Sequence, residues 1–293
     1  MKNSGIRIRW ITTCCFEVVL PNGKVLCFDP WDGSMPEGEK MPPEDTGVTY
    51  DDFVGADYIF LSHSHGDHIF GAKYLSEKFR KDTYGGHIFM PAMSTKIMCD
   101  QLDIPYRDAV PMFPGETLNL EDIIVTCHKC RHFGDVGSPY GTQPSVARKR
   151  LEEEGGDPEK AYMSNMGSIE EVDLSITVKE NNFRFMVLGG RIYRFYNIYD
   201  YAKTFNPDFV IRQLSPGFTP EEYAEMVHQY HAPIVFPSHH DSHRLEKKRG
   251  TTYEEYFSAV NRHLEEMGSV TRVVNIQRTK WYRIGVTCCD AED

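Results

Sequence analysis

The chain has 293 residues, a formal net charge of -11 and 40% hydrophobic residues. This length and apolar content suffice for one large domain or two small ones with a packed core. The acidic balance argues against general binding to nucleic acid or anionic membranes, and no apolar stretch of about 18 residues predicts a membrane span. Because the N-terminus also lacks the apolar segment of a signal peptide, we expect a cytoplasmic protein with reduced thiols.

The first third of the chain predicts a hairpin and then a strand–loop–helix unit. The hairpin has apolar runs at residues 15–20 and 25–28 around a Pro-Asn-Gly turn, and its second run ends at Asp29. The adjacent cysteines Cys14 and Cys15 are expected to be packing residues that face opposite ways. Further elements are predicted as a buried strand at 58–61, a helix at 72–81 and a strand at 123–127.

The stretch His63-Ser64-His65-Gly66-Asp67-His68 directly follows the buried strand at 58–61. His63 and His65 are two residues apart in extended chain and therefore point to the same side. Gly66 allows a sharp turn that brings Asp67 and His68 back toward the same point. Imidazole nitrogens and a carboxylate oxygen that converge at a strand end suit a divalent transition metal; the alternative is a histidine-rich surface loop.

Residues 134–171 carry little periodic apolar content, apart from a short charged helix expected near 145–154. A long irregular insertion of this kind is typical of a functional loop or of a disordered segment. We expect a single domain over residues 1–293 in which the insertion at 134–171 covers the site as a flap, with a plain surface excursion as the alternative.

The last third of the chain alternates strands and helices. Residues 174–178 and 183–188 predict a second hairpin, and Thr219 has the chemistry of a helix N-cap before Pro220. Further elements are predicted as a strand at 209–211, a helix at 220–230, a strand at 234–236, a helix at 253–267 and strands near 271–276 and 281–286. Two sheets with helices outside follow from this order.

The hexapeptide at 63–68 matches the His-x-His-x-Asp-His motif of the metallo-β-lactamase superfamily, and the resemblance extends from the first strands to about His239. It implies an α/β fold, a four-layer αββα sandwich in which two mixed sheets pack face to face with helices outside. The metal site is then expected at one edge of the two sheets. The overall plan resembles most closely the branch of L-ascorbate-6-phosphate lactonase and related metal-dependent hydrolases.

The resemblance implies two sets of metal ligands. His63 and His65 match two ligands of a first metal; the third is a histidine after a later strand, for which His132 fits best and His128 is the rival. Asp67 and His68 match ligands of a second metal, together with the last histidine of the motif, His239, in a Pro-x-His setting. Asp29 resembles the aspartate that orients a ligating histidine from outside the metal's coordination shell.

One position departs from the family pattern. The family places an aspartate that bridges the two metals after the second hairpin, where this chain has Gly189-Gly190-Arg191. Because Gly190 has no side chain, the site is expected to hold either one ion or a weaker second one. Asp200 or Asp241 could supply the carboxylate instead, and a shift of the alignment by a few residues is a further alternative.

The resemblance implies a hydrolase that uses a metal-bound hydroxide, with zinc favoured and manganese or iron left open. Asp67 would act in catalysis by orienting the nucleophile. The expected substrate is an ester, lactone or phosphoester of a small anionic metabolite, contacted by Arg191 and His240; ordinary surface positions are the alternative for both. A phosphodiesterase or nuclease, and a metal-binding sensor without turnover because of Gly190, are the competing functions. Neither a nucleic-acid nor a membrane partner is expected, and self-association is left open.

Overall fold

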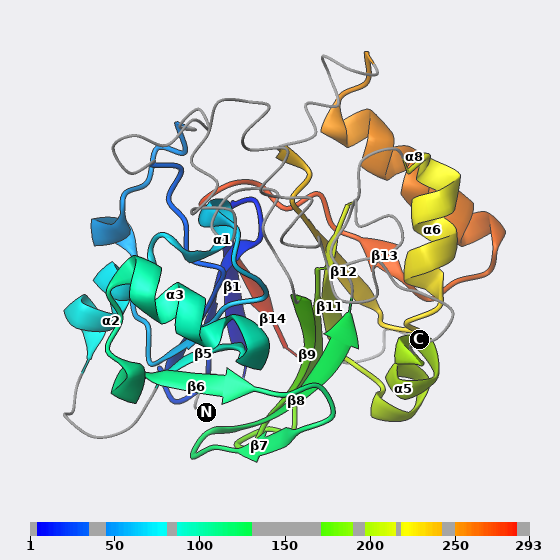
Figure 1. Ribbon diagram of the computed structural model, residues 1–293. Coiled ribbons are helices and arrows are strands. Elements are labelled where there is room, and N and C mark those ends of the chain that lie inside the picture. Colours follow the sequence, from blue (N-terminus) through cyan, green and yellow to red (C-terminus); the bar gives the residue numbers. More distant parts are fainter. Residues whose placement is uncertain are drawn as a thin grey trace, which may run out of the picture.

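The computed structural model describes residues 5–34, 45–80, 87–130, 171–189, 197–214, 218–241 and 250–285. Within these residues, two seven-stranded sheets pack face to face and helices cover both outer faces (Figure 1). The order of layers is helix, sheet, sheet, helix. The predicted αββα sandwich is therefore confirmed.

The N-terminal sheet has the strand order β14-β1-β2-β3-β4-β5-β6. Neighbouring strands from β14 to β3 are antiparallel, and β2 and β3 form the predicted hairpin. Strands β3 to β6 run parallel to one another. The strands are β1 (Ile6–Thr12), β2 (Cys15–Val19), β3 (Val25–Phe28), β4 (Tyr58–Phe60), β5 (Ile88–Pro91), β6 (Ala109–Met112) and β14 (Trp281–Ile284).

The C-terminal sheet has the order β13-β12-β11-β10-β9-β8-β7. Strands β7 to β10 are antiparallel and contain the second predicted hairpin, and β10 to β13 are parallel. The strands are β7 (Thr117–Asn119), β8 (Ile123–Cys130), β9 (Glu171–Val178), β10 (Arg184–Leu188), β11 (Phe209–Gln213), β12 (Ile234–Ser238) and β13 (Arg272–Val273).

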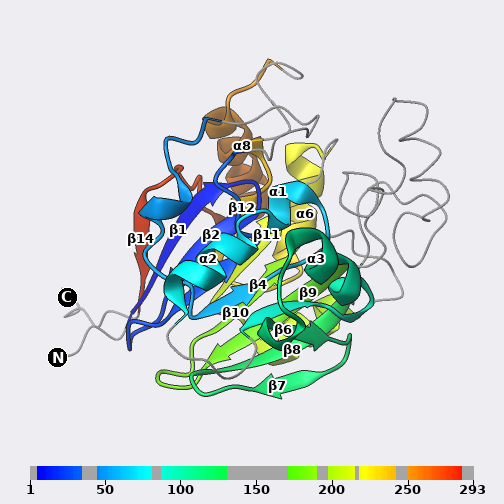
Figure 2. The ribbon, with the colours of Figure 1, turned by 60° about the vertical axis from the view of Figure 1, so that its left-hand side comes forward.

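Figures 1 and 2 show α2 and α3 against the N-terminal sheet, and α5, α6 and α8 against the C-terminal sheet. Thr219 and Thr252 accept the backbone N–H of the residue three positions later, which fixes where α6 and α8 begin. The α-helices are α1 (Gly66–Ile69), α2 (Ala72–Phe79), α3 (Thr95–Leu102), α5 (Ile198–Phe205), α6 (Pro220–His228) and α8 (Tyr253–Glu266), and the 3-10 helices are η1 (Tyr50–Asp52), η2 (Ala92–Ser94) and η3 (Tyr106–Asp108).

Three apolar clusters correspond to the three interfaces between the four layers. The central one lies between the sheets, where Phe28 stacks on Phe60 and Phe185 stacks on Phe209. Alternation along the strands produces this cluster, since every second side chain of β9 faces the opposite sheet. The two sheets are therefore held together by apolar packing that reaches the edge where β3, β4 and β12 end.

The predicted insertion lies almost wholly outside the described residues, which stop at Cys130 and resume at Glu171. Glu171, the last residue of the predicted insertion, is the first residue of β9. The flap, the charged helix near 145–154 and the single domain stay predictions. Among the described helices, none has the length and apolar content that crossing a membrane requires.

Candidate metal centre

The hexapeptide forms the connection between β4 and α1. The strand ends at Phe60, whose carbonyl accepts the backbone N–H of Asp29, and His65 is the N-cap of the short helix α1. A Cβ at Gly66 would lie 2.3 Å from the Phe70 ring, so any larger residue at this turn would displace that ring. The turn places the side chains before and after it on the same side of the chain.

The imidazole rings of the hexapeptide gather with that of His239, which follows β12. Ring centroids are 4.5 Å apart for His63 and His65, 4.0 Å for His63 and His68, and 5.4 Å for His68 and His239. Asp67 Oδ2 lies 3.5 Å from His239 Nε2 and 3.9 Å from His68 Nε2. Asp67, His68 and His239 thus offer three donor atoms within 4.8 Å of one another.

Asp29 fixes the orientation of His68. Its Oδ2 lies 2.9 Å from His68 Nδ1. A carboxylate oxygen only accepts hydrogen bonds, so Nδ1 carries the proton and Nε2 presents its lone pair toward Asp67. Asp29 occupies the end of β3 with a φ of +43°, a conformation that aspartate tolerates better than most residues. A carboxylate behind a histidine is the usual arrangement that orients a metal ligand.

Ser62 fixes the tautomer of His63 in a similar way. Its hydroxyl donates to Asp29 Oδ2 at 2.7 Å and also lies 2.8 Å from His63 Nδ1. Because the single hydroxyl proton is directed to Asp29, His63 Nδ1 must be the donor in the second bond. The Nε2 lone pair of His63 is then available for a metal. One aspartate and one serine therefore determine the tautomer of two histidines.

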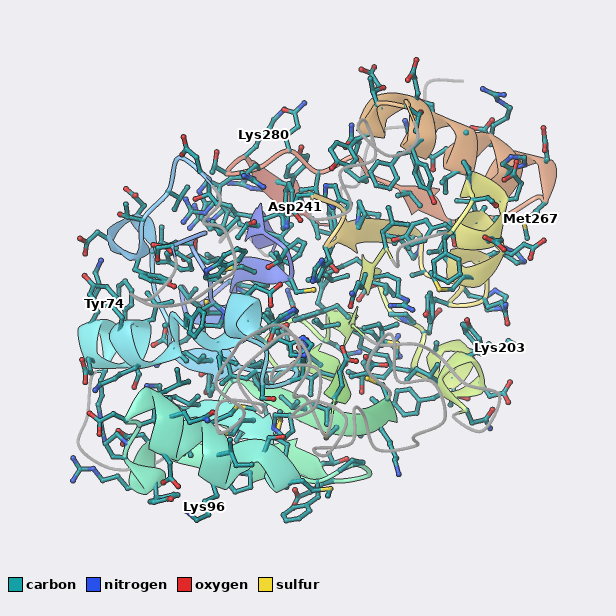
Figure 3. The ribbon with its side chains drawn as sticks, turned by 45° about the horizontal axis from the view of Figure 1, so that its top comes forward. Tyr74, Lys96, Lys203, Asp241, Met267 and Lys280 are labelled. Carbon is teal, nitrogen blue, oxygen red and sulfur yellow. The ribbon has the colours of Figure 1, made fainter. Side chains whose placement is uncertain are left out.

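The turn between β1 and β2 positions the loop after β12. The Thr13 carbonyl accepts the N–H of His239 at 2.7 Å, and the Thr13 hydroxyl donates to the Asp67 carbonyl at 3.1 Å. Asp241 accepts from Thr12, from the Thr13 backbone and from Arg278. Figure 3 shows Asp241 between the N-terminal strands and the elements around β12. This network holds together segments that are more than 200 residues apart.

The electrostatics of the site favour an ionised Asp67. Burial alone would raise its pKa, but His68 and His239 beside it hold that pKa well below its usual value. Burial disfavours a charged His239, yet the hydrogen bond that His239 donates to Asp67 raises the pKa of that imidazole. The thiol of Cys14 is buried next to the same groups: burial raises its pKa first, and Asp29, Glu171 and Asp67 raise it further.

The residues of this site fit a divalent transition metal. Asp67 is 7% exposed, and its Oδ1 is buried without a hydrogen-bond partner among the described residues. Burying such an oxygen costs folding free energy unless a hydrogen-bond donor or a metal ion contacts it. Imidazole nitrogens with a carboxylate oxygen form the donor set that zinc, manganese and iron accept. The pattern proposed from the sequence therefore converges in space for His63, His65, Asp67, His68 and His239.

Other predicted residues lie outside the described part of the chain or away from the centre. The first group contains His132, Gly190 and Arg191. His128, the rival third ligand, belongs to β8, and its Nε2 lies 2.9 Å from the Ser175 hydroxyl. Burial lowers the pKa of His128 to about 4, which is typical of a neutral packing histidine.

The carboxylates suggested as substitutes for position 190 have other contacts. Asp241 is engaged by Thr12, Thr13 and Arg278, and the Asp200 side chain on α5 is 63% exposed and 3.6 Å from Lys203. Asp200 is therefore a solvent-exposed side chain, whereas Asp241 lies near His239 but already has hydrogen-bond partners. His240 is 2% exposed and stacks on Trp10 at 4.3 Å, so its place in the fold gives no support to the predicted contact with substrate.

Four residues of the site were missed or misread in the sequence. Cys14 was expected only to pack, but its thiol lies with Asp29 and His68 in a second group of possible ligands. Ser62 could have been found, since a polar residue ends an otherwise apolar strand directly before His63. Thr13 and Glu171 come from distant segments, and no local pattern distinguishes them.

The comparisons agree with this geometry. Residues 56–156 match the family model of the metallo-beta-lactamase superfamily. This match, the αββα fold and the histidine motif together confirm the predicted resemblance to that superfamily.

The chain also resembles proteins named UPF0173 metal-dependent hydrolase. One from Myxococcus xanthus is 24% identical over 62% of this chain, and the match spans 60% of that relative. Another, from Polynucleobacter asymbioticus, is 24% identical over 81% of this chain and 75% of its own length. The solved structure of Igni18, a metallo hydrolase from Ignicoccus hospitalis, has the same fold with a TM-score of 0.62 at 12% identity, covering 97% of this chain and all of that one.

Proposed function

We propose that the protein is a metal-dependent hydrolase that cleaves an ester, lactone or phosphoester of a small anionic metabolite. The observation that carries the proposal is the buried group of Asp67, His68 and His239 beside His63 and His65. The names of the Myxococcus and Polynucleobacter relatives support hydrolysis. The anionic substrate is supported by sequence alone, through Arg191 after the glycine pair.

Zinc is the proposed metal, and His63, His65, Asp67, His68 and His239 are the described residues that would hold it. A bound divalent ion would acidify water and polarise the oxygen of the scissile group at neutral pH. The protein itself holds the rings of His68 and His63 in the required orientation through Asp29 and Ser62. Asp67, held ionised beside His239, would accept a hydrogen bond or a proton from the attacking water.

The test is hydrolysis by the purified protein loaded separately with Zn²⁺, Mn²⁺ or Fe²⁺. Panels of lactones, carboxylic esters, phosphomonoesters and phosphodiesters are assayed with the wild type and with Asp67→Asn. We expect turnover of at least one class and a loss of about 100-fold or more in kcat for Asp67→Asn. A protein that binds metal tightly but turns over no panel would instead support the sensor; one that binds no metal would overturn the proposal.

A further inference from the structure

Glu171 lies at the centre of the site although no motif includes it. The backbone N–H of Val172, in β9, donates a hydrogen bond to the Ser62 carbonyl at 3.0 Å. This bond brings the start of β9 against the loop that carries the ligands. Glu171 Oε1 is then 3.8 Å from His63 Nδ1, and the two side chains are 1% and 2% exposed. A carboxylate is therefore buried directly behind a candidate metal ligand.

Gly189 makes room for this carboxylate. A Cβ at position 189 would lie 2.6 Å from Glu171 Oε1, closer than side-chain carbons approach other atoms. The Gly189 N–H is fixed in turn by Asp173 Oδ1 at 2.8 Å, so the backbone cannot retreat freely. The absence of a side chain at Gly189 thus leaves the space that the Glu171 carboxylate occupies. Gly189 follows β10 and stands one residue before the position that lacks the family's bridging aspartate.

The charge of the site gives a second argument. Asp29, Asp67 and Glu171 are 3%, 7% and 2% exposed, and all three surround the Cys14 thiol. Histidines that bind a metal are neutral and offset none of this negative charge. When ionised, these three carboxylates carry a charge of −3, which exceeds the +2 of one divalent ion and is exceeded by the +4 of two.

We propose that the Glu171 carboxylate belongs to the metal centre and supports the binding of a second divalent ion. From the start of β9 it lies behind His63, on the Nδ1 side, and supplies negative charge to a site that lacks the acidic group at Gly190. The inference rests on the proposed function, because it concerns the same metal site. It weakens the reason for expecting a single ion, since a carboxylate from another strand supplies negative charge close to the ligands.

The experiment measures metal stoichiometry and affinity, not turnover. Metal-free wild type, Glu171→Gln and Glu171→Asp are titrated with Zn²⁺ and Mn²⁺ by calorimetry, and bound metal is counted by elemental analysis. The control is Asp108→Asn, which removes a buried carboxylate paired with Arg80. Asp108 accepts the N–H of His87 just before β5, at the opposite end of the strands from the site.

We expect two ions per wild-type chain, and a second ion that binds about 10- to 100-fold more weakly to Glu171→Gln, with partial recovery in Glu171→Asp. The control should keep both affinities, and circular dichroism at the titration temperature checks that each variant is folded. Equal stoichiometry and affinity in wild type and Glu171→Gln, or a wild type that takes up one ion only, would overturn the inference. A wild type that binds no metal would instead defeat the proposed function.

Discussion

Replacing Ser62 by alanine tests the hydrogen bonds that set the histidine tautomers. The hydroxyl contacts Asp29 Oδ2 at 2.7 Å and His63 Nδ1 at 2.8 Å, and the variant removes both bonds. Loss of a group that orients a metal ligand costs about 10- to 100-fold in affinity, or about 1.4–2.8 kcal/mol of binding free energy. In the metal-free protein, the buried Nδ1–H of His63 loses its acceptor, which costs about 1–3 kcal/mol of stability.

The assay is competition for Zn²⁺ against a chromophoric chelator, together with urea unfolding of the metal-free protein. Ser64→Ala is the matched control, because Ser64 is 1% exposed and its hydroxyl has no hydrogen-bond partner among the described residues. We expect weaker zinc binding in Ser62→Ala and an unchanged affinity in Ser64→Ala. If both variants bind zinc as tightly as the wild type, the hydroxyl does not orient His63 and the tautomer argument is wrong.

Three further predictions concern single side chains. His65→Ala should lose metal, and unchanged metal content by elemental analysis would refute its role as a ligand. Gly189→Ala should displace the Glu171 carboxylate, since the new Cβ lies 2.6 Å from Oε1, and weaken the second ion about tenfold in a zinc titration; equal affinity would show that the space is not needed. The pKa of His128 is lowered by burial to about 4 from 6.5, so its contribution to stability is present above pH 6.5 and is lost as the pH falls toward 4. The wild type should therefore lose unfolding free energy between pH 7 and pH 4, and His128→Gln should lose less, by at most about 3 kcal/mol. Metal content should not change. If the variant and the wild type have the same pH profile of stability, the assigned burial of His128 is wrong.

The fold was predictable because its signals are local. Apolar runs around Pro-Asn-Gly and Asn-Asn turns marked the two hairpins, and Thr219 marked the start of α6. The helix expected to reach Lys81 ends at Phe79 in the structure, an error of the size expected at helix ends. Strand and helix periodicity therefore predicted the order of the four layers. The exact ends of the helices depend on capping contacts that the sequence shows only in part.

The site was predictable only where its residues are close in sequence. The residues from His63 to His68 share one turn, so their convergence follows from backbone geometry alone. Glu171 reaches His63 because β8 pairs with β9 in a register that sets Glu171 opposite Cys130, and strand pairing of this kind is not readable from one sequence. Of the carboxylates suggested in place of Gly190, Asp200 is exposed on α5 and Asp241 is held by Thr12, Thr13 and Arg278.

The turn at Thr13 has a consequence for how the protein acquires metal. It bonds to both Asp67 and His239, which belong to loops of different sheets. A nascent chain that has not yet reached His239 cannot assemble this group of ligands, however early the first hairpin folds. Metal capture is therefore expected to select fully folded molecules, and each bound ion adds its binding free energy to the contact between the two sheets.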